Sequence, residues 1–338
     1  MMKYLIYFSF ISIFISCQTQ QKQRQYTIYG DAQGTTYTIT YISEKPIAKQ
    51  SIDSILKVID LSMSTYIDNS LITKINKNEN LPVDEHFKKV FLASKQIFQE
   101  SEGYFDPSIG VLIDAWGFGK KENHTPPTQQ QIDSLLSRIG LDKITLTEDN
   151  YLEKKNKDIR LNFNAIAQGY TSDLISNYLL SKKINNFIVE VGGELYIHGK
   201  NILKNKSWLI GIDNPLQKPD EDREIVATLN LENCGLATSG NYRKLWVDEQ
   251  TGKKYVHTIN PKTGYPEQSN LLSATVITSS AMMADGYATT LMALGVERAK
   301  QFLSEHKELK AILLYSDEAN PNIIQKYTTD NLEVNFEK

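Results

Sequence analysis

The sequence contains few cysteines, no excess of charge of either sign and only a short apolar run at its N-terminus. Its two cysteines can form neither a disulfide framework nor a zinc cluster. Its 37 Lys and Arg residues nearly balance 40 Asp and Glu residues, which argues against a nucleic-acid-binding protein, because such proteins need a basic face. A hydrophobic fraction of 41% is typical of a globular protein and excludes the disordered and fibrous classes.

The apolar run covers residues 4–16 and follows Lys3, which is typical of a secretory signal. It is too short to span a bilayer, since a membrane-spanning helix takes about 20 residues. The run ends in Phe14-Ile15-Ser16-Cys17, and a small residue before a cysteine at this place resembles a bacterial lipobox. Lipobox processing would leave a lipid-modified Cys17 as the first mature residue and anchor the protein to a membrane. The alternative is an ordinary signal peptide with a chance cysteine.

The length allows one large domain or two smaller ones. No low-complexity linker interrupts the chain, and we expect a signal over residues 1–16, a polar tether over 17–25 and a single domain over 26–338. Strands and helices are mixed without strict βα order, which favours an α+β fold with antiparallel sheet. Cys234 is expected to pack as a small buried apolar side chain.

Hydrophobic periodicity predicts the main elements. Helices are expected over residues 84–102, 129–139, 165–180 and 282–294. Strands are expected over residues 26–30, 35–42, 187–191, 194–198, 208–212, 225–230 and 274–277, the first two joined as a hairpin around residues 31–34. Residues 200–207 and 215–224 are expected to form exposed loops.

Two glycine-containing clusters in the first half of the chain are candidates for ligand binding. Tyr104-Phe105-Asp106-Pro107 is followed by Trp116-Gly117-Phe118-Gly119, where glycines allow close backbone approach and rings could line a planar ligand. A packed aromatic turn is the alternative. Residues 162–170 lead from a strand end into a helix N-terminus, whose free N–H groups suit a phosphate. An ordinary capped helix start is the alternative, and no Walker A lysine or GxGxxG pattern supports a P-loop or Rossmann site.

Three further clusters lie in the second half. Residues 237–243 include hydroxyl donors and Arg243, which suit a charged group, although a polar turn would use the same residues. His257 leads into a Pro/Gly-rich loop and is a candidate general base or a structural histidine. Asp285 and Thr289 are four residues apart and share one helix face, so their oxygens suit Mg²⁺ completed by phosphates and water. A helix-terminal carboxylate beside a satisfied threonine is the alternative.

The order of these clusters along the chain is the most specific feature of the sequence. The series comprises Gly34-Thr35-Thr36, Met63-Ser64-Thr65-Tyr66, Phe105-Asp106-Pro107, Trp116-Gly117-Phe118-Gly119, Ala165-Ile166-Ala167-Gln168-Gly169-Tyr170, Val191-Gly192-Gly193-Glu194, Ala237-Thr238-Ser239-Gly240, His257-Thr258-Ile259-Asn260-Pro261-Lys262-Thr263-Gly264 and Ala284-Asp285. It resembles the ApbE family of FAD:protein FMN transferases over roughly residues 30–315. The resemblance implies an α+β fold related to the T-fold, with FAD in a cleft between two lobes.

The resemblance also implies roles for single residues. Asp285 and Thr289 would be magnesium ligands, with the Ala165 carbonyl as a third, and His257 would lie near the reacting phosphates. The FAD site would be lined by Tyr66, Trp116, Gly117, Phe118, Asn162, Gln168 and Ile259. Four positions depart from the family pattern: Asn162 and Asn260 replace Asp, Gln168 replaces Lys, and Gln33 stands where Met often precedes Gly-Thr.

By this resemblance the protein would be an Mg²⁺-dependent enzyme that moves FMN from FAD to a Thr or Ser hydroxyl of a target flavoprotein and releases AMP. The target would be a membrane redox-complex subunit or a secreted flavoprotein. The anchored protein would belong to the bacterial cell envelope and face the periplasm. Two alternatives stay open at this point, an FAD pyrophosphatase that forms FMN and AMP, and a non-catalytic periplasmic FAD-binding lipoprotein.

Overall fold

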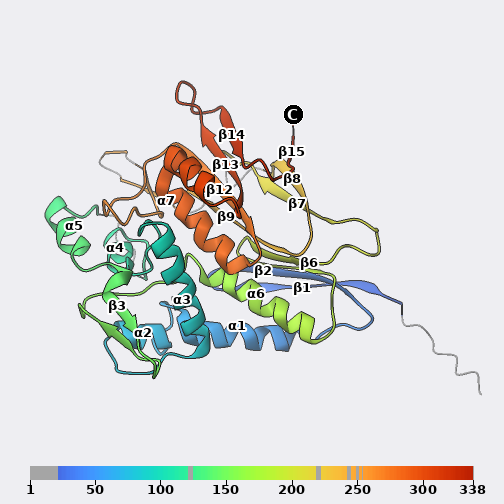
Figure 1. Cartoon of the computed structure of the whole chain (residues 1–338), viewed down its shortest axis with the longest axis horizontal. Coiled ribbons are helices and arrows are strands. Elements are labelled where there is room, and N and C mark those ends of the chain that lie inside the picture. Colours follow the sequence, from blue (N-terminus) through green and yellow to red (C-terminus); the bar gives the residue numbers. More distant parts are fainter. Residues whose placement is uncertain are drawn as a thin grey trace, which may run out of the picture.

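A computed structural model of the chain describes residues 22–120, 125–217, 222–241, 245–248, 251–252 and 254–337. The expected signal segment, Cys17 and Arg243 lie outside these ranges. The described residues form a mixed α+β fold built around one large antiparallel sheet (Figure 1). The expected fold class is confirmed by this arrangement and by the antiparallel pairing along the sheet.

The central sheet has eight strands in the order β1-β2-β5-β6-β9-β12-β13-β14. Their bounds are β1 Arg24–Ala32, β2 Thr35–Ser43, β5 Phe187–Val191, β6 Glu194–His198, β9 Cys234–Gly240, β12 Leu271–Thr278, β13 Lys310–Ser316 and β14 Ile324–Thr328. The predicted hairpin is confirmed, because Ala32 pairs with Thr35 across a turn in which Gln33 and Gly34 both have positive φ. The predicted strands over 187–191 and 194–198 are found with the same bounds.

Helices cover one face of this sheet (Figure 1). They include α1 (Lys49–Met63), α3 (Glu85–Glu100), α6 (Ala167–Ser181) and α7 (Ala281–Glu305). Side chains that alternate along β2 and β5 pack against α1 and α6, where Tyr37, Ile39 and Val189 are at most 1% exposed. A larger core joins α3 and α7 to β12 and β13. Burial of these apolar faces is the main stabilising contribution to the fold.

A second, smaller sheet packs against the opposite face of the central sheet. Its strand order is β15-β8-β7, with β7 at Trp208–Asp213, β8 at Ile225–Leu231 and β15 at Asn335–Phe336. Trp208, Ile210 and Ile212 alternate inward from β7 and form a core with side chains of the central sheet. Cys234 of β9 packs against this core but is half-buried, so it is less enclosed than the sequence predicts.

An aromatic subregion lies beside the helices. It contains α4 (Gly110–Ala115), α5 (Gln129–Leu136), β10 (Leu245–Val247) and β11 (Lys254–Val256), which share a core around Trp116. The remaining short elements are α2 (Leu71–Asn76), a 3-10 turn at Leu141–Lys143, β3 (Ile144–Leu146) and β4 (Leu152–Lys154). Among the described helices, none combines the length and the apolar character that crossing a bilayer demands.

Local signals set the helix ends. Asp84 accepts a hydrogen bond from the Phe87 N–H and begins α3, and Thr128 begins α5 with a capping box. Helix α7 is longer than predicted. Its helical backbone breaks at Gly295, where φ is 70°, and this is where the predicted helix ends, but the chain resumes the helix to Glu305.

Candidate active site

Helix α7, which carries the predicted magnesium ligands Asp285 and Thr289, contacts α6 at Gly169. The Gly169 N–H in the first turn of α6 donates a hydrogen bond to Asp285 Oδ2 at 3.1 Å. A Cβ atom at this position would lie 2.3 Å from the Ala281 carbonyl oxygen and 2.9 Å from the Asp285 Cβ, so only glycine permits this approach. Close packing of α6 against α7 therefore fixes the position of the Asp285 carboxylate.

Asp173, further along α6, holds the beginning of α7. Its carboxylate accepts hydrogen bonds from the Ser280 hydroxyl at 2.7 Å and from the N–H groups of Ala281 and Met282 at 2.9 and 3.0 Å. A carboxylate at a helix N-terminus satisfies unpaired N–H groups and complements the helix dipole. Asp285 follows one turn later, so the same contact positions the residue that we expect to bind the metal.

Asp285 is an unusual carboxylate because it is only 4% exposed. Burial raises the pKa of Asp285 to about 7, the Gly169 N–H opposes this shift, and the negative charge of Asp173 adds to it. No ion pair within the described residues involves Asp285. A buried carboxylate of this kind favours a bound cation, which would compensate its charge.

Thr289 lies one helical turn after Asp285, and its Oγ1 is 3.3 Å from the Ser239 Oγ of β9. The Ala165 carbonyl belongs to the segment just before α6. Carboxylate, hydroxyl and carbonyl oxygens are hard ligands that suit Mg²⁺ when phosphates and water complete the shell. The described part of the chain contains no cluster of three His, Cys, Asp or Glu residues able to hold a metal, so hydroxyl, carbonyl, phosphate and water oxygens would have to complete the shell of a cation at Asp285.

The turn between β1 and β2 packs onto the beginning of α6. Gln33 Nε2 donates to Thr171 Oγ1 at 2.8 Å, and Gln168 Nε2 donates to the Gln33 carbonyl at 3.5 Å. Gln33 Oε1 is buried, and among the described residues it has no hydrogen-bond partner. A buried acceptor without a donor fits a ligand that carries an N–H group, as the flavin ring does.

Asn162 lies where the two clusters of the first half meet. Its side chain is 9% exposed, and Oδ1 accepts from the Asn164 N–H at 2.8 Å. Its own N–H donates to the carbonyl of Pro107, which belongs to the aromatic cluster. Gly110 approaches the Arg160 carbonyl so closely that a Cβ would lie 2.7 Å from it. The segment before Asn162 and the beginning of α4 are thus held side by side.

Trp116 is packed rather than open to a ligand. Its indole is 1% exposed, donates to the Gly264 carbonyl at 2.7 Å and lies 5.2 Å from the Tyr255 ring. A nucleotide could therefore reach only its main chain. Phe118 is more open, and its ring centre lies 6.5 Å from that of His257 in an edge-on arrangement. The bond from Trp116 to Gly264 joins the predicted FAD-binding turn to the loop that follows His257.

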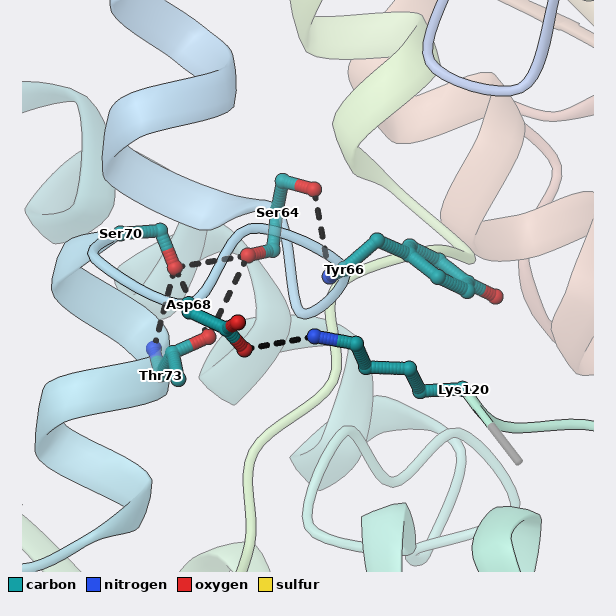
Figure 2. A network of polar contacts seen from close by, with 6 residues as sticks. All are labelled: Ser64, Tyr66, Asp68, Ser70, Thr73 and Lys120. Carbon is teal, nitrogen blue, oxygen red and sulfur yellow. Dashed lines mark hydrogen bonds and ion pairs between the residues drawn. The ribbon is translucent and has the colours of Figure 1, made fainter.

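Tyr66 lies in an exposed loop between α1 and α2 (Figure 2). Its side chain is 49% exposed and points away from the polar contacts that hold the loop. The Tyr66 N–H donates to Ser64 Oγ at 3.3 Å, and the Ser70 hydroxyl donates to the Ser64 carbonyl at 2.7 Å. Lys120 pairs with Asp68 at 2.6 Å and so joins this loop to the turn that contains Phe118.

Comparison with known proteins identifies the family. The ApbE family pattern matches residues 33–313. The chain belongs to the ApbE family. It is 33% identical over 312 residues to the FAD:protein FMN transferase of Haemophilus influenzae, covering 88% of this chain and 89% of that relative. The solved structure of the flavin transferase ApbE from Vibrio cholerae matches with a TM-score of 0.81 and 29% identity, covering 91% of this chain and 98% of that one. The apo form of the Pseudomonas stutzeri flavinyl transferase ApbE matches with a TM-score of 0.80 and 27% identity over 91% of this chain and 95% of that one.

The resemblance read from the sequence is thereby confirmed, whereas the roles of single site residues stay predictions. The fold brings Asp285, Thr289 and the start of α6 to one place. It also brings Phe118 close to His257, and the hydrogen bond from Trp116 to Gly264 holds together the two loops that carry these residues. Sequence reasoning missed Asp173, because its partner Ser280 is 107 residues away and a lone aspartate within a helix gives no signal. It also left Ala237–Gly240 open as a polar turn, whereas these residues form the end of strand β9.

Proposed function

We propose that this member of the ApbE family is an FAD:protein FMN transferase that moves FMN from FAD to a Thr or Ser hydroxyl of a target flavoprotein and releases AMP. The observation that carries the proposal is the buried Asp285 carboxylate, which Gly169 and the capped start of α7 hold one turn before Thr289. A buried carboxylate that accepts a single hydrogen bond is costly to ionise, and a bound cation would compensate its charge. The activity named for the relatives at 29–33% identity points the same way.

Asp285, Thr289 and the Ala165 carbonyl would hold Mg²⁺. The burial of the Asp285 carboxylate without an ion pair among the described residues favours such a cation. When bound, Mg²⁺ would offset the negative charge that develops on the phosphates. Tyr66 and the 116–118 turn would hold the nucleotide, with Asn162, Gln168 and Ile259 completing its site. Ile259 is 3% exposed and pairs with Pro266, so it would contribute a fixed apolar surface.

The reaction exchanges one phosphorus–oxygen bond for another. The acceptor hydroxyl oxygen forms a bond to the FMN-side phosphorus, the bond to the bridging oxygen breaks, and AMP leaves with that oxygen and its electron pair. The hydroxyl proton would pass to a ring nitrogen of His257 and from there to water. A general base of this kind contributes typically about 10²–10⁴-fold to the rate.

The location of the enzyme is a proposal of its own. A lipid-modified Cys17 would anchor the protein in the bacterial envelope facing the periplasm, and residues 18–25 would separate the domain from the membrane. The target would then be a redox-complex subunit of that membrane or a secreted flavoprotein. Metabolic labelling of the full chain with a palmitate analogue, with Cys17→Ser as the control, tests this proposal.

The activity is tested by incubating residues 18–338 with FAD, Mg²⁺ and the soluble domain of a candidate redox subunit, followed by mass spectrometry. We expect covalent FMN on the acceptor and an equal amount of AMP. Free FMN without a labelled acceptor would indicate a pyrophosphatase, and unchanged FAD a flavin carrier. His257→Ala should lower the transfer rate at neutral pH, whereas His306→Ala, at the far end of α7, should not. Equal rates for the two variants would refute the role of His257.

A further inference from the structure

Asn260, one of the positions that depart from the family pattern, lies in the loop that follows His257. At the base of this loop the Glu267 N–H donates to the Thr258 carbonyl at 2.8 Å. The main-chain N–H of Asn260 forms a second bond across the loop, also at 2.8 Å. Residues 258–267 therefore form a closed loop, and the bond at its base lies one residue from His257.

The side chain of Asn260 is only 9% exposed, and its partners leave one orientation for the amide. Its Oδ1 accepts from the Lys262 N–H at 2.9 Å, whereas its Nδ2 faces two acceptors. These are Glu267 Oε2 at 2.9 Å and, in a longer contact, the Ala293 carbonyl at 3.5 Å. A main-chain N–H can only donate, so the amide oxygen must face Lys262 and the amide nitrogen must face the two acceptors.

The two acceptors connect the closed loop to helix α7. Ala293 lies one helical turn after Thr289, and the helical backbone breaks two residues later at Gly295. A Cβ at Gly295 would lie 4.0 Å from Glu267 Oε1, so the Glu267 carboxylate lies beside this break. Asn260 thus joins the closed loop to the helix that carries the predicted magnesium ligands.

A carboxylate at position 260, as in the family pattern, would not fit these partners. An ionised Asp has no N–H to donate, so its second oxygen would face the Glu267 carboxylate and the Ala293 carbonyl. No ion pair within the described residues involves Glu267, and neighbouring carboxylates without a cation repel each other. The Asn260 amide and the Glu267 carboxylate are therefore a matched pair in this chain.

We propose that Asn260 is a positioning residue that holds the closed loop at a fixed place on α7 and so sets the distance between His257 and the metal ligands of that helix. The inference rests on the proposed function, in which His257 accepts the hydroxyl proton and Asp285 binds Mg²⁺. It adds to that function the contact that keeps the two groups at a fixed separation. Displacing a catalytic group by about 1 Å can lower a rate by about 10²-fold.

Reversing the hydrogen bond tests the proposal. Asn260→Asp should lower kcat at saturating FAD and acceptor by about tenfold or more at neutral pH, because the new carboxylate repels Glu267 and displaces the loop. Combining it with Glu267→Gln should restore kcat to within about threefold of the wild type, since the Gln amide can donate to the Asp carboxylate. Asn322→Asp, exposed in the turn between β13 and β14, adds the same charge and is the matched control. No loss in Asn260→Asp, or no recovery in the double variant, would overturn the matched pair.

A second background separates positioning from a merely structural role. In His257→Ala, the further change Asn260→Asp should lower kcat by less than about twofold, because the group that it displaces is already absent. The gain in Tm on adding Mg²⁺ should be the same in Asn260→Asp as in the wild type, since Asp285 keeps its own contacts. A loss of equal size in both backgrounds would overturn the proposal.

Hydrogen exchange separates failure of this inference from failure of the proposed function, because it needs neither FAD nor acceptor. The amides of Asn260, Gly264 and Glu267 are bonded within the closed loop. They should exchange faster in Asn260→Asp and at the wild-type rate in the double variant. Unchanged exchange in Asn260→Asp would overturn the proposal. This exchange pattern in a chain whose wild type labels no acceptor would instead contradict the proposed function.

Discussion

The two ends of the candidate active site are built in different ways. At the end where we propose the metal (the metal end), Asp285 is buried, Gly169 brings two helices into contact, and Asp173 fixes the start of α7. At the end where we propose the nucleotide (the nucleotide end), Tyr66 is half-exposed on a loop, and an exposed ion pair joins that loop to the next one. The metal end therefore has one geometry set by close packing, whereas we expect the nucleotide end to adjust to a bound ligand.

Asp285→Asn should break the metal end with the largest effect. The amide keeps the shape of the side chain but loses the charge, and the loss of several kcal/mol of metal-assisted stabilisation corresponds to a fall in kcat of about 10³-fold or more. Transfer rates measured over a range of Mg²⁺ concentrations test this, with Asp133→Asn on the exposed face of α5 as control. Full activity of Asp285→Asn, or activity in EDTA, would contradict the metal assignment.

The second-largest effect should be a pH dependence of the stabilisation by Mg²⁺ that arises at the metal end alone. Burial raises the pKa of Asp285 to about 7 in the metal-free protein, so the unfolded chain, with a pKa near 4, releases this proton first. The contribution of Asp285 to stability is therefore complete below about pH 4 and is lost as the pH rises through about 7. Mg²⁺ competes with the proton, so the gain in Tm on adding Mg²⁺ should be larger at about pH 8 than at about pH 6.

Asp285→Asn isolates this effect from other buried carboxyls. Burial also raises the pKa of Asp106 to about 6 and that of Asp173 above its ordinary value, so the pH profile of the wild type is a sum. The variant should lose the difference in Mg²⁺ stabilisation between the two pH values and should keep the remaining pH profile. A Tm gain that is equal at both pH values in the wild type would show that Asp285 does not bind the metal.

The metal end was the more predictable of the two from sequence. Asp285 and Thr289 lie four apart in a helix, and this spacing survives in the fold because it depends only on local geometry. The contacts that position them could not be predicted, since Gly169 and Asp173 meet α7 across more than 100 residues of chain. The sequence could not decide the role of Trp116, because glycines beside aromatic rings are typical of both a ligand site and a packed turn. Tertiary packing buries its indole.

Apolar periodicity does not by itself decide which elements the sequence predicts. Helix α6 has a weak period and was predicted over residues 165–180, whereas α1, whose buried Ile52, Leu56 and Ile59 repeat with a helical period, was not predicted. The helix over Glu85–Glu100 and the strands at residues 187–198 carry clear apolar periods. Residues 237–243 fit either a binding site or a polar turn by sequence, yet pairing with β12 holds residues 237–240 extended as part of β9. Propensity is overridden here by the two strands on either side.

Tyr66→Ala should affect the nucleotide end by a smaller amount. Stacking of a base on an aromatic side chain is worth about 1–3 kcal/mol, so the KM for FAD should rise by about tenfold while kcat at saturating FAD stays nearly constant. Tyr66→Phe keeps the ring and should behave as the wild type. Tyr29→Ala, 76% exposed on β1, is the matched control. A fall in kcat without a change in KM would place Tyr66 at the metal end instead.

The ion pair between Lys120 and Asp68 should give the smallest effect. Its side chains are 51% and 83% exposed, so solvent screens the attraction, and Lys120→Ala should raise the KM for FAD by less than about threefold. Asp68→Asn should give the same rise, and the double variant should give no more, because either change removes the same ion pair. The rise should vanish at high salt, where the wild type loses the link as well. Asp53→Asn, which breaks the equally short pair with Lys49 on α1, should leave the KM unchanged. Additive effects of the two substitutions would mean that Lys120 or Asp68 contacts the nucleotide directly, and the nucleotide end would then be as firmly built as the metal end.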